Sequence, residues 1–228
     1  YFMFLRPDGF QGTLPLTVMI HGGGWQNGYA VDHGVYPLFE RARREGFALA
    51  ALQYRFVSDA AAGGVQPPVK AVYDDCFAAI RHLKDQAAAF GIDPARITLV
   101  GGSAGACTIL QLALKDSNPL GIAEVYPNIA QTTLDPQLTR AWLPNLRYGA
   151  QAFGLSWTEF VRRRDELKPL IDAWSPLALL EKADPKRLPS IHLAYDHAYP
   201  GGIYTGTGRD DSVHDAAFGY PFLSACRR

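Results

Sequence analysis

The chain has 228 residues, of which 48% are hydrophobic and 12% aromatic, so it is long enough to bury one large core. Its 22 basic and 22 acidic residues give a formal net charge of zero, which argues against nucleic acid or another strongly charged partner. No apolar run approaches the length of a membrane span. The cysteines (Cys76, Cys107 and Cys226) are too few for a disulfide framework, and we expect buried thiols at the first two.

The first part of the chain alternates between strand and helix patterns. Residues 1–5 resemble a strand already under way, which predicts a further segment upstream, and residues 14–20 form an apolar strand pattern. Residues 36–45 have helical spacing, and residues 47–52 are a nearly continuous apolar run, typical of a strand buried on both faces of a parallel sheet. Residues 58–68 are rich in Ala, Gly and Pro and predict a loop.

The clearest helix pattern covers residues 69–90, where apolar residues recur with a period of 3.6. Adjacent Asp74 and Asp75 in this helix do not share a face, so we expect structural contacts there and no metal site. Strand patterns follow at 97–100 and 122–126. The alternation, with connections long enough for right-handed crossovers, predicts an α/β fold: a doubly wound, mostly parallel sheet with helices on both faces.

Residues 101–105 read GGSAG and join the strand pattern at 97–100 to a helical pattern that runs to residue 114. This sequence fits G-x-S-x-G, in which the serine occupies a tight strand-to-helix turn with its hydroxyl exposed for attack. Every neighbour of Ser103 within two positions is Gly or Ala, as such a turn requires because strand and helix approach closely. Ser103 is therefore the candidate nucleophile.

A second motif lies upstream, where the strand pattern at 14–20 ends in residues 21–25, HGGGW. A strand followed by HGGG is the oxyanion loop that accompanies the serine turn in esterases and lipases. With both motifs in this order, residues 16–190 resemble the α/β-hydrolase superfamily, and more narrowly the hormone-sensitive-lipase-like and carboxylesterase-type branch. The resemblance implies one α/β-hydrolase domain over residues 1–228.

The pattern loosens after residue 126. Residues 127–169 contain several aromatics and the basic run at 162–164, and we interpret them as a helical, cap-like insertion over the sheet. The arginine run favours a solvated helix face over an anion site. Residues 188–195 predict one more strand. No obvious strand follows before Arg228, so we expect the chain to be truncated at both ends.

The resemblance implies a catalytic triad in the chain order Ser, acid, His. The acid is expected after the strand that ends near Tyr195, where Asp196 lies, and Asp210 and Asp211 are the alternatives.

For the base, His214 in a polar loop is the choice, since His192 falls inside the strand pattern and His197 adjoins Asp196. The other interpretation is that the base lies beyond Arg228, which would leave the triad incomplete.

The same resemblance implies an oxyanion hole formed by the N–H groups of Gly22, Gly23 and Ala104, with His21 supporting the loop. Trp25 and Tyr29 are expected to bind substrate. No metal or organic cofactor is implied, and the sequence does not indicate an oligomeric state.

The resulting hypothesis is a serine esterase that acts on a small-molecule ester through an acyl-enzyme on Ser103. Short acyl esters, including acetyl or feruloyl esters of carbohydrates, are the substrates that the resemblance implies. Two alternatives stay open. One is an amidase or peptidase of the same fold, and the other is a catalytically incomplete α/β-hydrolase relative that binds a ligand without turnover.

Overall fold

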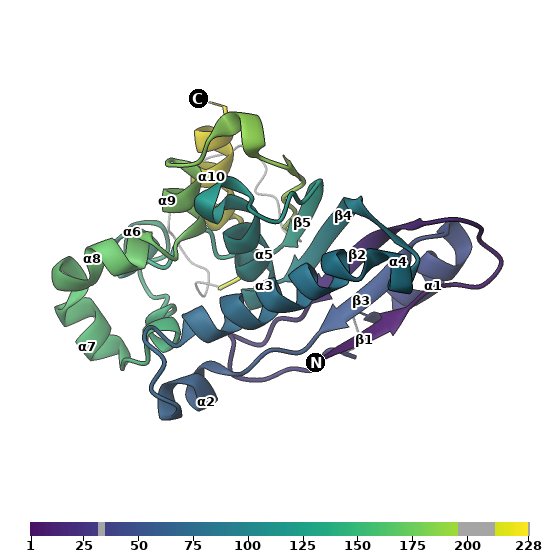
Figure 1. The fold of residues 1–228 in the computed structure, drawn as a ribbon. Helices are drawn as coiled ribbons and strands as arrows, with labels where there is room; N and C mark the ends of the chain where they lie inside the picture. Colours follow the sequence, from purple (N-terminus) through teal and green to yellow (C-terminus); the bar gives the residue numbers. More distant parts are fainter. Residues whose placement is uncertain (32–34, 196–212, 228) are drawn as a thin grey trace.

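The computed structural model describes residues 1–31, 35–195 and 213–227. Within these residues, six strands form one sheet in the order β1-β3-β2-β4-β5-β6 (Figure 1). Strand β1 pairs with β3 in antiparallel fashion, and the other neighbours are parallel. The predicted α/β architecture with a mostly parallel sheet is therefore confirmed.

The strands span these residues: β1 (Phe2–Leu5), β2 (Leu14–Ile20), β3 (Ala48–Leu52), β4 (Ile92–Gly102), β5 (Glu124–Asn128) and β6 (Ser190–Ile191). The α-helices are α1 (Val35–Glu45), α2 (Val57–Ala62), α3 (Val69–Asp85), α4 (Ala87–Phe90), α5 (Ala104–Leu114), α6 (Pro136–Trp142), α7 (Trp157–Arg162), α8 (Arg164–Asp172), α9 (Pro176–Leu180) and α10 (Gly219–Cys226). Short 3-10 turns are η1 (Lys115–Ser117), η2 (Ala150–Phe153), η3 (Pro185–Arg187) and η4 (Ala216–Phe218).

The interior strand β3 is buried at every position because helices cover both faces of the sheet. Its residues alternate between the two faces, as the period of two requires. Leu49 and Ala51 belong to the cluster around α1, whereas Ala48, Ala50 and Leu52 belong to the larger core under α3 and α5. Figure 1 shows α3 and α5 in front of the sheet.

The elements differ from the sequence expectations in several places. Strand β4 begins at Ile92, before the strand pattern at 97–100, and β5 lies two residues after the pattern at 122–126. The loop expected at 58–68 contains α2, and the helix expected at 69–90 is interrupted at Gln86, whose φ of −104° and ψ of 22° separate α3 from α4. The strand expected at 188–195 is regular only at β6, but its backbone hydrogen bonds to β5 continue through His192 and Ala194. Helix α10 had no counterpart among the expectations.

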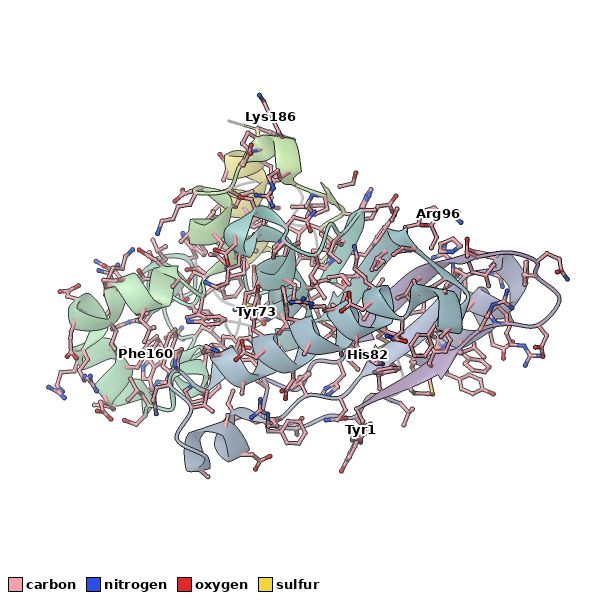
Figure 2. All side chains as sticks on the ribbon, viewed as in Figure 1. Tyr1, Tyr73, His82, Arg96, Phe160 and Lys186 are labelled. Carbon is pink, nitrogen blue, oxygen red and sulfur yellow. The ribbon has the colours of Figure 1, made fainter. Side chains whose placement is uncertain are left out.

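Helices α6, α7 and α8 form a group at one end of the molecule, opposite α1 (Figure 1). Phe160, labelled in Figure 2, is fully buried in this group and stacks on Phe153 with ring centroids 5.1 Å apart. None of the described helices combines the length and apolar character needed to cross a membrane.

The arginine run differs partly from the expected solvated face. Arg163, between α7 and α8, does form surface ion pairs with Glu159 and Glu166 of these helices. Arg164, however, is only 20% exposed and pairs with Asp135, whose side chain is 2% exposed. The difference arises because Asp135, which caps α6, lies next to the start of α8 in space, and sequence spacing does not show that contact.

Candidate active site

Ser103 lies at the junction between β4 and α5 with φ of 55° and ψ of −121°. A non-glycine residue at positive φ costs about 1–3 kcal/mol, and such strain persists only where the surroundings hold it. Here Ser103 N–H donates to the carbonyl of Asn128 at 2.9 Å, which joins the turn to the end of β5. The backbone thus has the strained conformation that G-x-S-x-G predicts.

The small residues around Ser103 allow strand, helix and loop to meet. A Cβ on Gly105 would lie 2.1 Å from the carbonyl oxygen of Ile20, and one on Gly101 would lie 2.8 Å from the backbone of Gly105. A Cβ on Gly102, by contrast, would meet nothing within 4 Å. The close packing therefore requires glycine at 101 and 105, and it brings α5 against the end of β2.

The loop at 21–25 lies directly beside the serine turn. A Cβ on Gly22 would be 2.8 Å from the carbonyl oxygen of Gly102 and 3.3 Å from Cβ of Ser103. Ala104 is the first residue of α5, and the N–H groups of a helix's first turn have no acceptor inside the helix. The loop and the start of α5 therefore both adjoin Ser103.

Tyr54, which follows β3, holds this loop from behind. Its ring stacks on the buried His21 ring at a centroid distance of 4.3 Å, and its hydroxyl lies 3.0 Å from the His21 carbonyl and 3.1 Å from the Gly22 carbonyl. Burial raises the pKa of Tyr54, so the hydroxyl stays protonated and remains a donor. The sequence analysis gave Tyr54 no role. The feature that could have indicated one is a polar aromatic residue two positions after a buried strand.

Trp25 supports the loop from the other side. It is fully buried, and its indole Nε1–H donates to Thr108 Oγ1 on α5 at 3.0 Å. This hydrogen bond ties the end of the loop to α5, and the expected contact of Trp25 with substrate stays a prediction. Tyr29, the other expected contact, is 70% exposed.

The described structure brings His214 to Ser103. The His214 Nε2 atom lies 2.9 Å from Ser103 Oγ, at a separation of 111 residues along the chain. The segment that carries His214 is fastened to the residues after β5: Gln131 Nε2 donates to the carbonyl of Val213 at 2.6 Å, and Thr132 Oγ1 donates to the carbonyl of Phe218 at 2.5 Å. Sequence reasoning missed both of these supports.

Asp215 and Phe218 complete that support. Asp215 accepts the N–H of Ala217 at 2.8 Å and so starts the turn η4, while Phe218 is fully buried against Leu143. The histidine is therefore presented by a short segment that is anchored on both sides.

The remaining expected residues divide into two groups. Asp196, His197, Asp210 and Asp211 lie outside the described residues. His192 stacks on Tyr126 with ring centroids 4.4 Å apart, and its N–H donates to the carbonyl of Val125, which places it in the edge of the sheet.

Two cysteines lie close to the site's supporting residues and are fully buried. Burial raises the pKa of Cys107, one helical turn after Ser103, and that of Cys76, so both are protonated thiols. The expectation of buried thiols is confirmed. In the part of the chain that the structure describes, no three His, Cys, Asp or Glu side chains are arranged as ligands of a metal ion.

Known esterases match parts of this chain. Gut esterase 1 of Caenorhabditis briggsae is 32% identical over 112 residues, which are 48% of this chain and 20% of that protein. Carboxylesterase NlhH of Mycobacterium tuberculosis is 31% identical over 99 residues, 43% of this chain and 28% of that protein. The chain thus spans less than a third of the length of either relative.

Solved structures match nearly the whole chain. A bifunctional GH43-CE protein of Bacteroides eggerthii superposes with a TM-score of 0.72 at 18% identity, covering 99% of this chain and 28% of that one. A truncated form of a carbohydrate esterase from gut microbiota gives a TM-score of 0.68 at 16% identity, covering 99% and 78%. At these identities the likeness shows a shared fold.

The sequence profile of one protein family, BD-FAE, matches residues 4–132, which are more than half of the chain. The matched stretch contains both the loop at 21–25 and the serine turn at 101–105. This chain therefore belongs to the BD-FAE family, a family of α/β-hydrolases.

Proposed function

We propose that this protein is a serine hydrolase that cleaves carboxylic esters, with Ser103 as nucleophile and His214 as base. The observation that carries the proposal is the 2.9 Å distance between Ser103 Oγ and His214 Nε2, at a strained serine beside the loop at 21–25. A serine hydroxyl is a weak nucleophile until a base accepts its proton, and this contact supplies the base. The esterase names of the relatives support the same reaction class.

In the proposed reaction, Ser103 Oγ attacks the ester carbonyl carbon while its proton passes to His214 Nε2. The carbonyl oxygen becomes an oxyanion that accepts hydrogen bonds from the N–H groups of Gly22, Gly23 and Ala104. When the C–O bond to the alcohol breaks, His214 returns the proton to the leaving oxygen and an acyl-enzyme remains. Water then attacks the acyl-enzyme while His214 accepts its proton. When the bond between the acyl carbon and Ser103 Oγ breaks, His214 returns the proton to Ser103 Oγ and the carboxylic acid is released.

The proposal assigns the third triad position to Asp196, with Asp210 and Asp211 as alternatives. A carboxylate there would hold the His214 ring in the tautomer whose Nε2 accepts a proton. Substituting each aspartate by asparagine separates the three, because only the true partner should lower turnover by orders of magnitude.

We also propose that residues 127–169 act as a cap within one catalytic domain. In support, residues 129–132 of this segment hold the His214 segment, and Ala150–Phe153 lies near the loop at 21–25, with Gln151 Nε2 4.0 Å from a Cβ built on Gly24.

The substrates that we propose are short acyl esters, including acetyl and feruloyl esters of carbohydrates. Two solved structures of the same fold are those of a carbohydrate esterase and a GH43-CE protein, which supports carbohydrate esters as substrates. The charged residues of the segment at 127–169 argue against bulk lipid, which would favour a more apolar cover.

The test is hydrolysis of p-nitrophenyl acetate, together with labelling by a fluorophosphonate probe. We expect Ser103→Ala to abolish labelling, and both Ser103→Ala and His214→Ala to lower kcat by about 1000-fold or more. Ser58→Ala, a substitution of an exposed serine on α2, is the matched control and should leave both readouts unchanged.

A parent protein that neither turns over the ester nor reacts with the probe would refute the proposal and favour a ligand-binding protein. Turnover of p-nitroacetanilide at a rate equal to that of the ester would instead identify an amidase.

A further inference from the structure

A cavity lies in the helical group formed by α6, α7 and α8, apart from the candidate active site. Its volume is about 510 Å³, and we call it the arginine cavity because Arg140, Arg162 and Arg164 line it. Neither Ser103 nor His214 contributes to its walls. The volume falls within the range of small-molecule sites and suits a ligand about as large as a single aromatic ring with its substituents.

One of the three arginines is a fixed part of the wall. Arg164 binds both carboxylate oxygens of the buried Asp135, with Nε–H donating at 3.0 Å, and its NH1 donates to Asp165 at 2.9 Å. These hydrogen bonds raise the pKa of Arg164. Since Asp135 also caps α6 through the N–H of Gln137, the pair fixes α6 against the start of α8 and keeps the cavity open.

The other two arginines have no such partner. Across the described residues, no carboxylate oxygen lies within 4.0 Å of a side-chain nitrogen of Arg140 or Arg162. Glu166, one turn after Arg162, is held by Arg163 at 2.6 and 3.0 Å and interacts with Arg162 only at longer range. Two exposed guanidinium groups from different helices therefore line one cavity without ion pairs of their own. The one carboxylate in its walls, that of Asp165, is paired with Arg164.

The remaining walls indicate what kind of anion would fit. Guanidinium groups bind carboxylates through paired, planar hydrogen bonds. Pro136, Pro144 and Val161 add apolar surface to the same cavity. An inorganic ion would leave that surface in contact with water, whereas an acid with an apolar body would cover it.

We propose that the arginine cavity is a second binding site, and that its ligand is a small organic carboxylate whose charge binds Arg140 and Arg162. Carboxylic acids are also the products that ester hydrolysis releases, so this class of ligand arises wherever the proposed reaction runs.

The cavity is connected to the segment that carries His214. Helix α6, which supplies Arg140, ends at Trp142, and Trp142 packs edge-on against Phe218 with ring centroids 6.1 Å apart. Leu143, the next residue, is fully buried in the same cluster. A ligand that steadies α6 should therefore also steady the segment from 213 to 222, a consequence that bears on catalysis only if the proposed function holds.

The test measures binding of benzoate to the full 228-residue chain by isothermal titration calorimetry, with neutral benzamide and inorganic phosphate as comparison ligands. We expect benzoate to bind at least tenfold more tightly than either comparison ligand. Arg140→Gln and Arg162→Gln should each weaken benzoate about tenfold, since a hydrogen-bonded charge contributes on that scale. Arg43→Gln on α1, at the opposite end of the molecule (Figure 1), removes the same charge and should change nothing.

Equal binding of benzamide, tighter binding of phosphate, or unchanged affinity in Arg140→Gln would each overturn the site. Amide hydrogen exchange tests the connection: benzoate should slow exchange at residues 213–222 in the parent and not in Arg140→Gln, and slowing confined to residues 136–165 would refute it. Binding is measured without turnover, so a protein that binds benzoate but hydrolyses no ester would refute the proposed function and leave the cavity's role intact.

Discussion

At the scale of residues, the position of the proposed oxyanion loop at 21–25 depends on buried side chains at its two ends. His21 and Trp25 are buried, and each has its own partner, Tyr54 for the former and Thr108 for the latter. Tyr54 follows β3 and Thr108 lies on α5, so the loop is held to both elements. Precise placement of backbone donors is what an oxyanion hole requires, because a shift of a few tenths of an ångström weakens a hydrogen bond.

Tyr54→Phe tests this clamp. The substitution removes the hydroxyl that lies near the His21 and Gly22 carbonyls while it keeps the stacked ring. We expect a loss of about 1–3 kcal/mol in the free energy of unfolding, because buried carbonyls lose a donor, and a decrease in kcat for p-nitrophenyl acetate with little change in KM. Urea denaturation and steady-state kinetics measure the two effects.

Tyr126→Phe, which removes an exposed hydroxyl bonded to Glu124, is the matched control for that substitution. It should leave both quantities nearly unchanged. A Tyr54→Phe protein with the stability and kcat of the parent would show that the hydroxyl does not hold the loop.

Some site residues could be found from sequence because their signal is local. The turn at 101–105 and the loop at 21–25 each carry their glycines within five consecutive residues. Most of these glycines lie so close to neighbouring backbone that a Cβ would not fit: Gly22, Gly23, Gly101 and Gly105. The contact between His214 and Ser103 spans 111 residues, and only the expected order of triad residues pointed to it. Gln131 and Thr132, which fasten the His214 segment, show no pattern at all, because their partners are backbone carbonyls of a distant segment.

At the scale of elements, the accuracy of the sequence expectations follows how strongly each element is patterned. Strands β2 and β3 and helix α1 agree with expectation to within a residue at each end. The strands are continuous apolar patterns, and the helix is amphipathic with a clear period. Helix α2 is short, and Ala and Gly around it gave no period to detect. Helix α10 owes its place to packing against α9, a tertiary contact that the local sequence does not contain.

The joint between β4 and α5 provides the sharpest test at this scale. A methyl group on Gly105 would lie 2.1 Å from the Ile20 carbonyl oxygen, so Gly105→Ala must push helix and strand apart. We expect a loss of about 3 kcal/mol or more in the free energy of unfolding, measured by urea denaturation, together with loss of fluorophosphonate labelling. Gly102→Ala, with open space around its added methyl, should be stable and should still react. If the two variants behaved alike, the close approach would not be what requires glycine here.

At the scale of the whole molecule, an ion pair joins the end of strand β3 to the long helix α3. Arg55 binds Asp75 through its backbone N–H at 2.9 Å and through its guanidinium at 2.6 Å. The sequence expectation that the paired aspartates serve structural contacts is confirmed here, and Asp74 likewise pairs with Lys70. The ion pair between Arg55 and Asp75 makes the contact between the end of β3 and α3 sensitive to acid.

The sign of that sensitivity follows from the pKa of Asp75. Burial acts to raise it, but the hydrogen bonds from Arg55 outweigh burial and hold the pKa of the folded state below the ordinary value of 3.8. A carboxyl whose pKa is lower when folded stabilises the fold above its unfolded pKa and loses that contribution as pH falls through the folded pKa. We therefore expect Asp75→Asn to cost about 1 kcal/mol near neutral pH, since the Arg55 side chain is 54% exposed, and progressively less below about pH 4.

Urea denaturation of parent and variant measures this difference between about pH 2.5 and 7, a range that includes the ordinary pKa of an aspartate. Asp85→Asn is the matched control, because its pair with Arg81 is longer at 3.6 Å and more exposed, so its effect should be smaller at every pH. A difference between parent and Asp75→Asn that stayed constant down to the lowest pH would mean that the carboxylate charge is not what joins Arg55 to α3. A difference that disappears in acid would instead show that one charged pair connects the end of β3, and with it Tyr54 and the oxyanion loop, to the longest helix of the fold.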